Sequence, residues 1–252
     1  MIGWRGTFFG IAGIMALAAL LIALAIREDP PSEAAAPRET LRQSFSGIPE
    51  VFRTDSVGRL FLMNLSTYSS FVLIVGLWGG PYLSHIYGHG LTERGNLLLI
   101  PAVTQILGLI AWGPLDRMFG NYKVPVLIGA GITCALLTLM AVLGTLPPVA
   151  LAVWLGVFGF CAGYTPAVLA HGKSLFAPHL VGRGITLLNM GTMGGAFLSQ
   201  AISGVAIDLF PSEAGAYPLA AYRLVFALQA GFVLVSCLAY LRARDPLQAA
   251  NR

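Results

Sequence analysis

Long apolar stretches, rather than an alternation of apolar and polar positions, dominate this 252-residue chain. A helix needs about 20 mainly apolar residues to cross a hydrocarbon layer of about 30 Å. A β-barrel is disfavoured, because its strands need alternating polar and apolar residues. The predicted spans lie near residues 7–26, 59–84, 96–114, 124–144, 149–170, 184–209 and 222–241. The pattern therefore predicts an all-α polytopic membrane protein with seven transmembrane helices.

The segment between the first two spans differs from the other connections. It runs from Arg27 to Gly58 and is rich in proline, alanine and charge, which indicates a linker. Within it, residues 40–52 have apolar positions at near-helical spacing, so a short helix on the membrane surface is expected. The other connections are short, which makes neighbouring spans antiparallel. The expected organisation is an isolated transmembrane helix over 1–26, a cytoplasmic linker over 27–58, a six-helix bundle over 59–244 and a cytoplasmic tail over 245–252.

Composition supports a bilayer environment. The set AVILMFWYC makes up 56% of the residues and only 10% are charged, against roughly 25% charged in an average soluble domain. An ordinary soluble enzyme is therefore excluded. The three cysteines all fall in apolar stretches, where a cysteine usually acts as a small buried hydrophobe.

The distribution of cations predicts the orientation. If the first helix enters from outside, 12 of the 15 Lys and Arg residues lie in inner segments, and only Arg5, Arg94 and Arg223 lie outside. Positive charge favours the cytoplasmic side, so we expect a multi-pass protein of the plasma (inner) membrane with its N-terminus outside and its C-terminus cytoplasmic. This topology also explains the net charge of +4 without a nucleic-acid partner.

The residue types needed by rival membrane proteins are missing from the predicted spans. Lys123 and Lys173 are the only lysines, and both fall at a membrane edge, which excludes a retinal protein. An intramembrane hydrolase would need a nucleophile motif, and none surrounds Ser199 or Ser203. The histidine pairs lack metal-ligand spacing. No enzyme activity, metal or cofactor is predicted.

The connection between the third and fourth spans carries the most specific motif. It contains Gly113, Asp116, Arg117, Gly120 and Lys123. This segment resembles the Gly-x-x-Asp-Arg-x-x-Gly-x-x-Lys loop of the major facilitator superfamily, although the most familiar version of that loop has one residue fewer between the Asp and the second Gly. The resemblance implies a gating loop whose carboxylate forms a contact in one transporter state and loses it in the other. The alternative is a topological turn in which the two cations anchor the membrane face.

The order of the spans adds a resemblance of layout. Gly3, Trp4, Arg5 and Phe8 are similar to the outer edge of the sixth helix in that superfamily. One span, a long inner linker and six further spans reproduce its sixth to twelfth helices. The resemblance implies two six-helix halves around a central solute cavity, with the first half missing here and the second built from two inverted three-helix repeats.

The second and sixth spans carry polar residues at helical spacing. Polar side chains that face lipid are disfavoured, so both stripes should point into the bundle. One interpretation is a solute-lining surface, to which the third and fifth spans add one residue each. The residues selected for it are Asn64, Tyr68, Gln105, Tyr164, Asn189 and Gln200. The other interpretation is helix packing, favoured on the sixth span by Gly191, Gly194, Gly195 and Gly204.

Together these observations predict a secondary transporter of the major facilitator type, present as its C-terminal half, that moves a small organic solute by alternating access. The alternative is a non-transporting fragment, or a membrane scaffold or partner subunit that needs a separate first half. The expected partners are the solute, the lipid bilayer, and either a missing N-terminal half or a second copy of the chain. No span has an acidic residue near its middle, so a proton relay would belong to the missing half.

Overall fold

A computed structural model describes residues 4–25, 48–212 and 215–247. The chain divides into two units, residues 1–40 and 41–252. The described residues of the first unit form one helix, α1 (Trp4–Ala25), whose 22 residues include no acidic side chain. At 1.5 Å per residue it is about 33 Å long, enough to cross a bilayer.

In the described part of the second unit, six further helices are long and apolar enough to span a membrane. They cover Val57–His85, Leu91–Trp112, Lys123–Leu143, Pro148–Leu175, Pro178–Ile207 and Leu219–Tyr240. With α1, the described residues therefore hold seven candidate spans and no β-strand. The all-α polytopic fold expected from the apolar pattern is confirmed.

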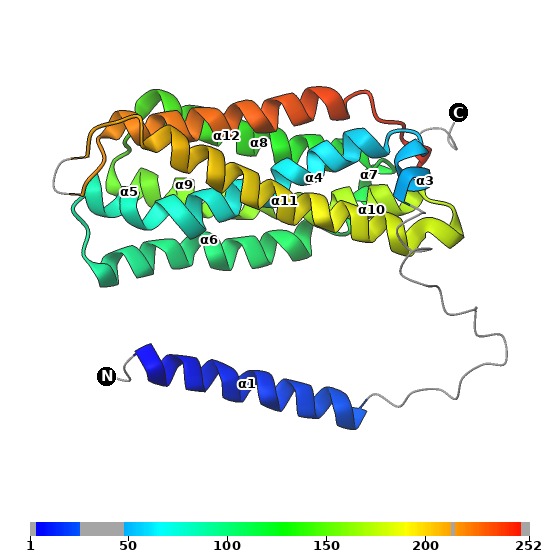
Figure 1. Ribbon diagram of the computed structural model, residues 1–252, viewed down its shortest axis with the longest axis horizontal. Coiled ribbons are helices and arrows are strands. Elements are labelled where there is room, and N and C mark those ends of the chain that lie inside the picture. Colours follow the sequence, from blue (N-terminus) through cyan, green and yellow to red (C-terminus); the bar gives the residue numbers. More distant parts are fainter. Residues whose placement is uncertain (1–3, 26–47, 213–214, 248–252) are drawn as a thin grey trace. The chain divides into compact units, whose positions relative to one another are not determined.

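Several spans consist of more than one regular element (Figure 1). The second span joins α4 (Val57–Phe71), a π-helix η1 (Val72–Trp78) and α5 (Gly79–His85). The fifth joins α9 (Pro148–Cys161), a 3-10 turn η2 (Ala162–Tyr164) and α10 (Thr165–Leu175). The other elements are α3 (Ile48–Arg53), α6 (Leu91–Trp112), α7 (Leu115–Phe119), α8 (Lys123–Leu143), η3 (Pro178–Leu180), α11 (Val181–Ile207) and α12 (Leu219–Tyr240).

Glycines allow close approach at two helix crossings. Helix α11 lies along α4 (Figure 1), and a Cβ at Gly195 would collide with the Leu65 carbonyl of α4. At the crossing of α6 and α9, a Cβ at Gly108 would collide with the Phe160 carbonyl, and a Cβ at Gly159 with the Pro101 carbonyl. In lipid the hydrophobic effect does not drive helices together. Van der Waals contact between closely packed backbones is therefore a main contribution to the free energy of helix association.

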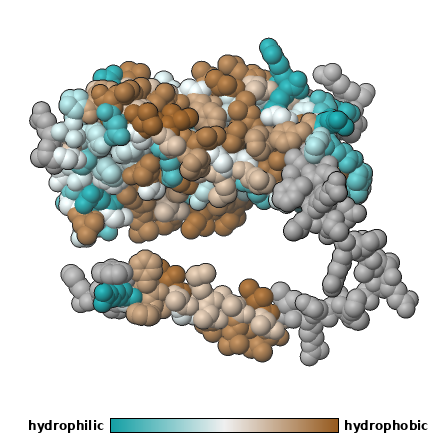
Figure 2. Space-filling view, in the orientation of Figure 1, coloured by the Kyte–Doolittle hydropathy of each residue, from teal (hydrophilic) through white to brown (hydrophobic). Residues whose placement is uncertain are grey.

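The surface of the six-helix unit is apolar in its middle and polar at its ends, on the face that Figure 2 shows. Large hydrophobic side chains are exposed on several helices, among them Ile110, Phe197 and Val205, each at least 70% exposed. Such a surface would promote aggregation in water, whereas hydrocarbon accommodates it. The exposed apolar side chains and the length of the apolar helices therefore both indicate that this unit lies in a bilayer.

Helix α3 belongs to the second unit, although it falls within the predicted linker. Its Val51 is fully buried, and α3 contacts both α4 and α11. The sequence predicted a short helix on the membrane surface over residues 40–52, and the structure has a short helix at Ile48–Arg53; its place at the membrane surface stays a prediction. Residues 26–47, which include the rest of that linker, lie outside the described residues.

Candidate solute-binding and gating site

The polar stripe of α4 meets the stripe of α11 in a hydrogen-bonded layer. The Asn64 side chain is 0% exposed, and its Nδ2 donates to the Leu60 carbonyl over 3.0 Å. The Thr192 hydroxyl donates to Asn64 Oδ1 over 3.3 Å and also to the Leu188 carbonyl. Asn64 of the second span and Thr192, a polar residue of the sixth span, are therefore brought together as a helix-packing contact.

A second polar layer ties α12 to α4. Gln229 Nε2 donates to the hydroxyls of Ser69 and Ser70 over 3.0 and 2.9 Å. On the second span, the indole Nε1 of Trp78 donates to Ser203 Oγ of α11 over 2.8 Å. Gln229 was not selected from the sequence, because only one other polar residue, Ser236, lies on its face of a mainly apolar span, which is too few to form a stripe.

Two other selected residues are also packed inside the unit. Tyr164 ends the 3-10 turn η2 and is fully buried, and a Cβ at Gly129 of α8 would lie 2.8 Å from its Cβ. Gln105 on α6 is 8% exposed. Tyr164, at the end of the 3-10 turn, thus packs its ring against α8.

The remaining three selected residues reach the surface of the six-helix unit. Asn189 is exposed, and Tyr68 and Gln200 are half-buried. Tyr68 stacks on Phe71, with 6.3 Å between ring centroids. Asn189 and Gln200 are eleven residues apart on α11, so they differ by only about 20° around the helix and share a face. These three side chains are available to a solute, whereas Asn64, Gln105 and Tyr164 are enclosed; the solute-lining role of all six stays a prediction.

The second span changes its hydrogen-bonding pattern just beyond Tyr68. The π-helix η1 covers Val72–Trp78, and α5 begins at Gly79. A Cβ at Gly79 would lie 2.5 Å from the Ile74 carbonyl and 2.8 Å from the Leu98 side chain. A π-helical segment places its side chains differently from an α-helix and is frequent at functional sites. Hydropathy alone could not reveal it, since the segment is apolar throughout.

The motif loop, residues 113–123, contains the short helix α7 and a tight turn. Gly120 has φ 56°, a left-handed conformation that favours glycine, and its amide donates to the Arg117 carbonyl. The Asp116 Oδ1 accepts a hydrogen bond from the Arg117 amide over 2.8 Å. Gly113, by contrast, has ordinary helical angles. Among the described residues Asp116 takes part in no ion pair, and its gating role stays a prediction.

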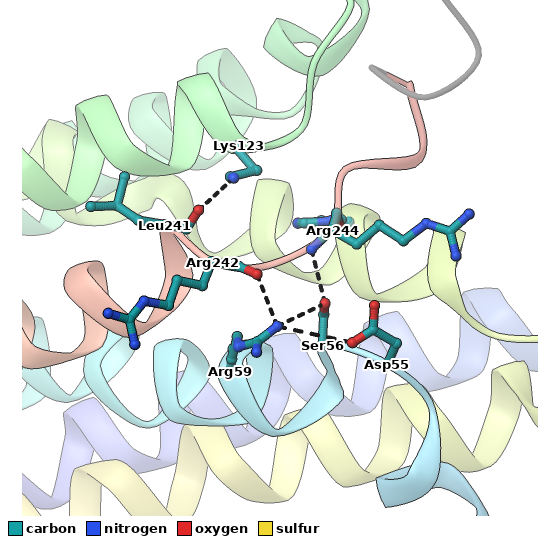
Figure 3. Close-up of polar contacts among 8 residues, drawn as sticks. Asp55, Ser56, Arg59, Lys123, Leu241, Arg242 and Arg244 are labelled. Atoms are coloured by element: carbon teal, nitrogen blue, oxygen red, sulfur yellow. Dashed lines mark hydrogen bonds and ion pairs between the residues drawn. The ribbon is translucent and has the colours of Figure 1, made fainter. Parts of the chain in front are cut away.

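Another carboxylate binds the end of the loop. Asp245 Oδ2 accepts from the amides of Tyr122 and Lys123 over 2.9 and 3.1 Å. The Lys123 ammonium donates to the Leu241 carbonyl over 2.7 Å (Figure 3). The sequence assigned Asp245 to the tail and gave it no role, since 122 residues separate it from Lys123 and no local pattern links them.

The comparisons with known proteins agree with this arrangement. The model of the Major Facilitator Superfamily matches residues 60–252. No curated protein sequence matches the chain. Because the family model covers most of the chain, it establishes the family.

Two solved structures share the fold. The nucleoside transporter NupG, crystallised as a single-residue variant, aligns with a TM-score of 0.66 and 17% identity over 90% of this chain. A bacterial homologue of the human lysosomal transporter Spinster, in an inward-facing and unoccupied conformation, aligns with a TM-score of 0.52 and 21% identity over 94% of this chain. In both cases the match covers 58% of the solved chain. On the strength of the family match, with the helical fold in agreement, the chain belongs to the major facilitator superfamily.

Proposed function

We propose that this chain acts as the C-terminal half of a secondary transporter that moves a small organic solute by alternating access. The observation that carries the proposal is the coincidence of the family match, residues 60–252, with the six-helix unit of residues 41–252. Transporters of this family are built from two six-helix halves around a site near the middle of the membrane. One such unit supplies one wall of that cavity.

The proposed wall includes Tyr68, Asn189 and Gln200, which are the selected residues that remain at least partly exposed. Hydrogen-bonding side chains on an apolar helix are costly against lipid and useful against a polar solute. These three residues do not identify the solute class, because amide and phenol groups form hydrogen bonds with many organic molecules. Nucleosides belong in a first solute panel, because NupG transports them.

The proposed orientation places the N-terminus outside and the motif loop and C-terminus in the cytoplasm of a plasma (inner) membrane. The cation distribution supports it, with 12 of 15 Lys and Arg residues on the proposed inner side. The proposed partner is a separate first half or a second copy of this chain. Either would cover the wall and close the cavity.

A second candidate role is a partner subunit that does not transport by itself. The packing of Asn64 against Thr192 and of Gln229 against Ser69 favours it, since these polar groups are satisfied inside the unit. Under both roles the isolated monomer is inactive.

Solute-uptake measurements in proteoliposomes test the proposal. The chain is reconstituted, its oligomeric state is measured in the same membranes, and uptake of a panel of nucleosides, sugars and amino acids is recorded. We expect no uptake by the monomer, and uptake of one solute class by a dimer or by a complex with a first half. Robust uptake by a verified monomer would contradict the half-transporter proposal. A complete assembly that transports nothing would favour the partner-subunit role.

A further inference from the structure

The seven residues that follow α12 cross the ends of other helices at the end of the unit that bears the motif loop. We call this segment, Leu241–Leu247, the strap. The Leu241 carbonyl accepts from the Lys123 ammonium over 2.7 Å, which ties the strap to α8. The Arg242 carbonyl accepts from Arg59 Nη1 over 2.8 Å, which ties it to α4 (Figure 3). Two cations from different helices thus hold successive strap carbonyls.

The middle of the strap is bound through Arg244. Its amide donates to Ser56 Oγ over 2.8 Å, just before α4 (Figure 3). Its carbonyl lies 2.8 Å from Nε2 of His171 on α10. Because a carbonyl can only accept, His171 Nε2 carries a proton. The other ring nitrogen, Nδ1, lies 2.6 Å from the Tyr240 hydroxyl oxygen, within hydrogen-bond distance. The His171 side chain is fully buried by these contacts.

Asp245 completes the strap with a contact of a different kind. Its Oδ2 binds the amides of Tyr122 and Lys123, and its Oδ1 binds the Leu247 amide over 3.0 Å. Asp245 is only 6% exposed. The first amides of a helix have no intrahelical acceptor and carry a positive partial charge, so a carboxylate there makes favourable hydrogen bonds. The start of α8 is therefore capped from a distant part of the chain.

Tyr122 is bound at both its backbone and its ring. Asp245 holds its amide, and its ring stacks on His171 with 5.3 Å between centroids and an interplanar angle of 3°. Asn121 contributes a separate cap, since its Oδ1 accepts from the amides of Lys123 and Val124 over 2.7 and 2.9 Å. Among these caps, Asp245 is the one that binds the Tyr122 amide.

We infer that Asp245 is a positioning residue for the motif loop, because its carboxylate fixes the start of α8. The strap thereby joins the ends of α4, α8 and α10 into one body, and this body moves as a unit when the transporter changes state. The motif residue Asp116 does not do this, since its carboxylate binds the neighbouring Arg117 amide. The part of the inference that concerns movement between states rests on the proposed function. The inference that Asp245 positions the motif loop does not depend on the proposed function.

Residue-resolved hydrogen exchange on the full chain in lipid nanodiscs tests the inference without any transported solute. In the wild-type protein we expect the Tyr122 amide to exchange at least about tenfold more slowly than an unstructured amide, because Asp245 binds it. In Asp245→Ala its exchange accelerates about tenfold, and in Asp245→Asn by less, because an amide oxygen is a weaker acceptor than a carboxylate. Amides in α6 and α9 keep their rates.

Two matched variants make the test specific. Asn121→Ala should accelerate Val124 but leave Tyr122 unchanged, and Asp116→Asn should change neither. Tyr122 exchange at the unstructured rate in the wild-type protein would overturn the inference even if every variant failed to fold. It would also be overturned if Asp245→Ala left Tyr122 unchanged, or if it accelerated all amides equally, which indicates a general structural role. A failure of uptake in proteoliposomes would change none of these rates, so the two proposals fail separately.

Discussion

At the scale of single residues, Asn64 shows how a polar group in a membrane helix serves packing. Its side chain is fully buried and has partners for both its nitrogen and its oxygen. Removing one partner of a buried hydrogen bond leaves the other unsatisfied, which costs about 1–3 kcal/mol.

We therefore expect Asn64→Ala to lower the free energy of unfolding by about 1–3 kcal/mol. Thr192→Val should cost a similar amount, because it leaves the buried Asn64 Oδ1 without its hydrogen-bond donor. In a double-mutant cycle the two changes should couple, since both remove the same contact. The measurement is denaturant unfolding in detergent micelles. Asn189→Ala, on the exposed face of α11, is the control and should change stability by less than about 0.5 kcal/mol; equal losses at both asparagines would contradict the packing role.

The sequence located the polar stripes but could not separate enclosed residues from available ones. Helical spacing defines a face about 100° wide, and Asn64 and Tyr68 differ by only about 40° around α4. The neighbour that covers Asn64 is Thr192, which is 128 residues away. Only the tertiary contact makes that distinction, and the same holds for Asp245.

At the scale of helices, the contact between α4 and α11 depends on Gly195. A Cβ there would collide with the Leu65 carbonyl, and backbone atoms cannot move aside as a flexible side chain can. Gly204, on the same helix, has no atom within 4 Å of its Cβ position. The two glycines therefore make a matched pair.

We expect Gly195→Ala to lower the free energy of unfolding by about 1–3 kcal/mol through overpacking. Gly204→Ala should be neutral or slightly stabilising, because alanine is the better helix former. Thermal unfolding followed by tryptophan fluorescence compares them. A Gly195→Ala variant as stable as Gly204→Ala would show that the helices are not in close backbone contact.

Each predicted span corresponds to a helix, but the ends of the helices were less well predicted. The third span was placed at 96–114, whereas α6 covers Leu91–Trp112. Its first turn contains the polar residues Thr92 and Glu93, and Glu93 accepts from the Gly90 amide as part of a helix cap. Hydropathy finds the apolar middle of a span, while capping groups decide where the helix begins.

At the scale of the whole molecule, the distribution of cations predicts the orientation in the membrane. We expect a cysteine at Met118, which is exposed in α7, to react with an impermeant thiol reagent only from the cytoplasmic side of intact cells or inverted vesicles. A cysteine at Gly88, in the turn before α6, should react only from the opposite side. Both variants use a background without Cys134, Cys161 and Cys237. Labelling of the two sites from the same side would refute the topology.

We propose that one face of the six-helix unit is a wall of an aqueous solute cavity. The most direct measurement is thiol labelling of single cysteines at Tyr68, Asn189 and Gln200 in native membranes, compared with Val142 on α8 and Leu234 on α12, which are 62% and 50% exposed. A water-soluble reagent reacts with thiols that meet water and fails with thiols that meet hydrocarbon. We expect labelling at the three wall positions and none at Val142 and Leu234. No labelling at the wall, or equal labelling at all five positions, would contradict it.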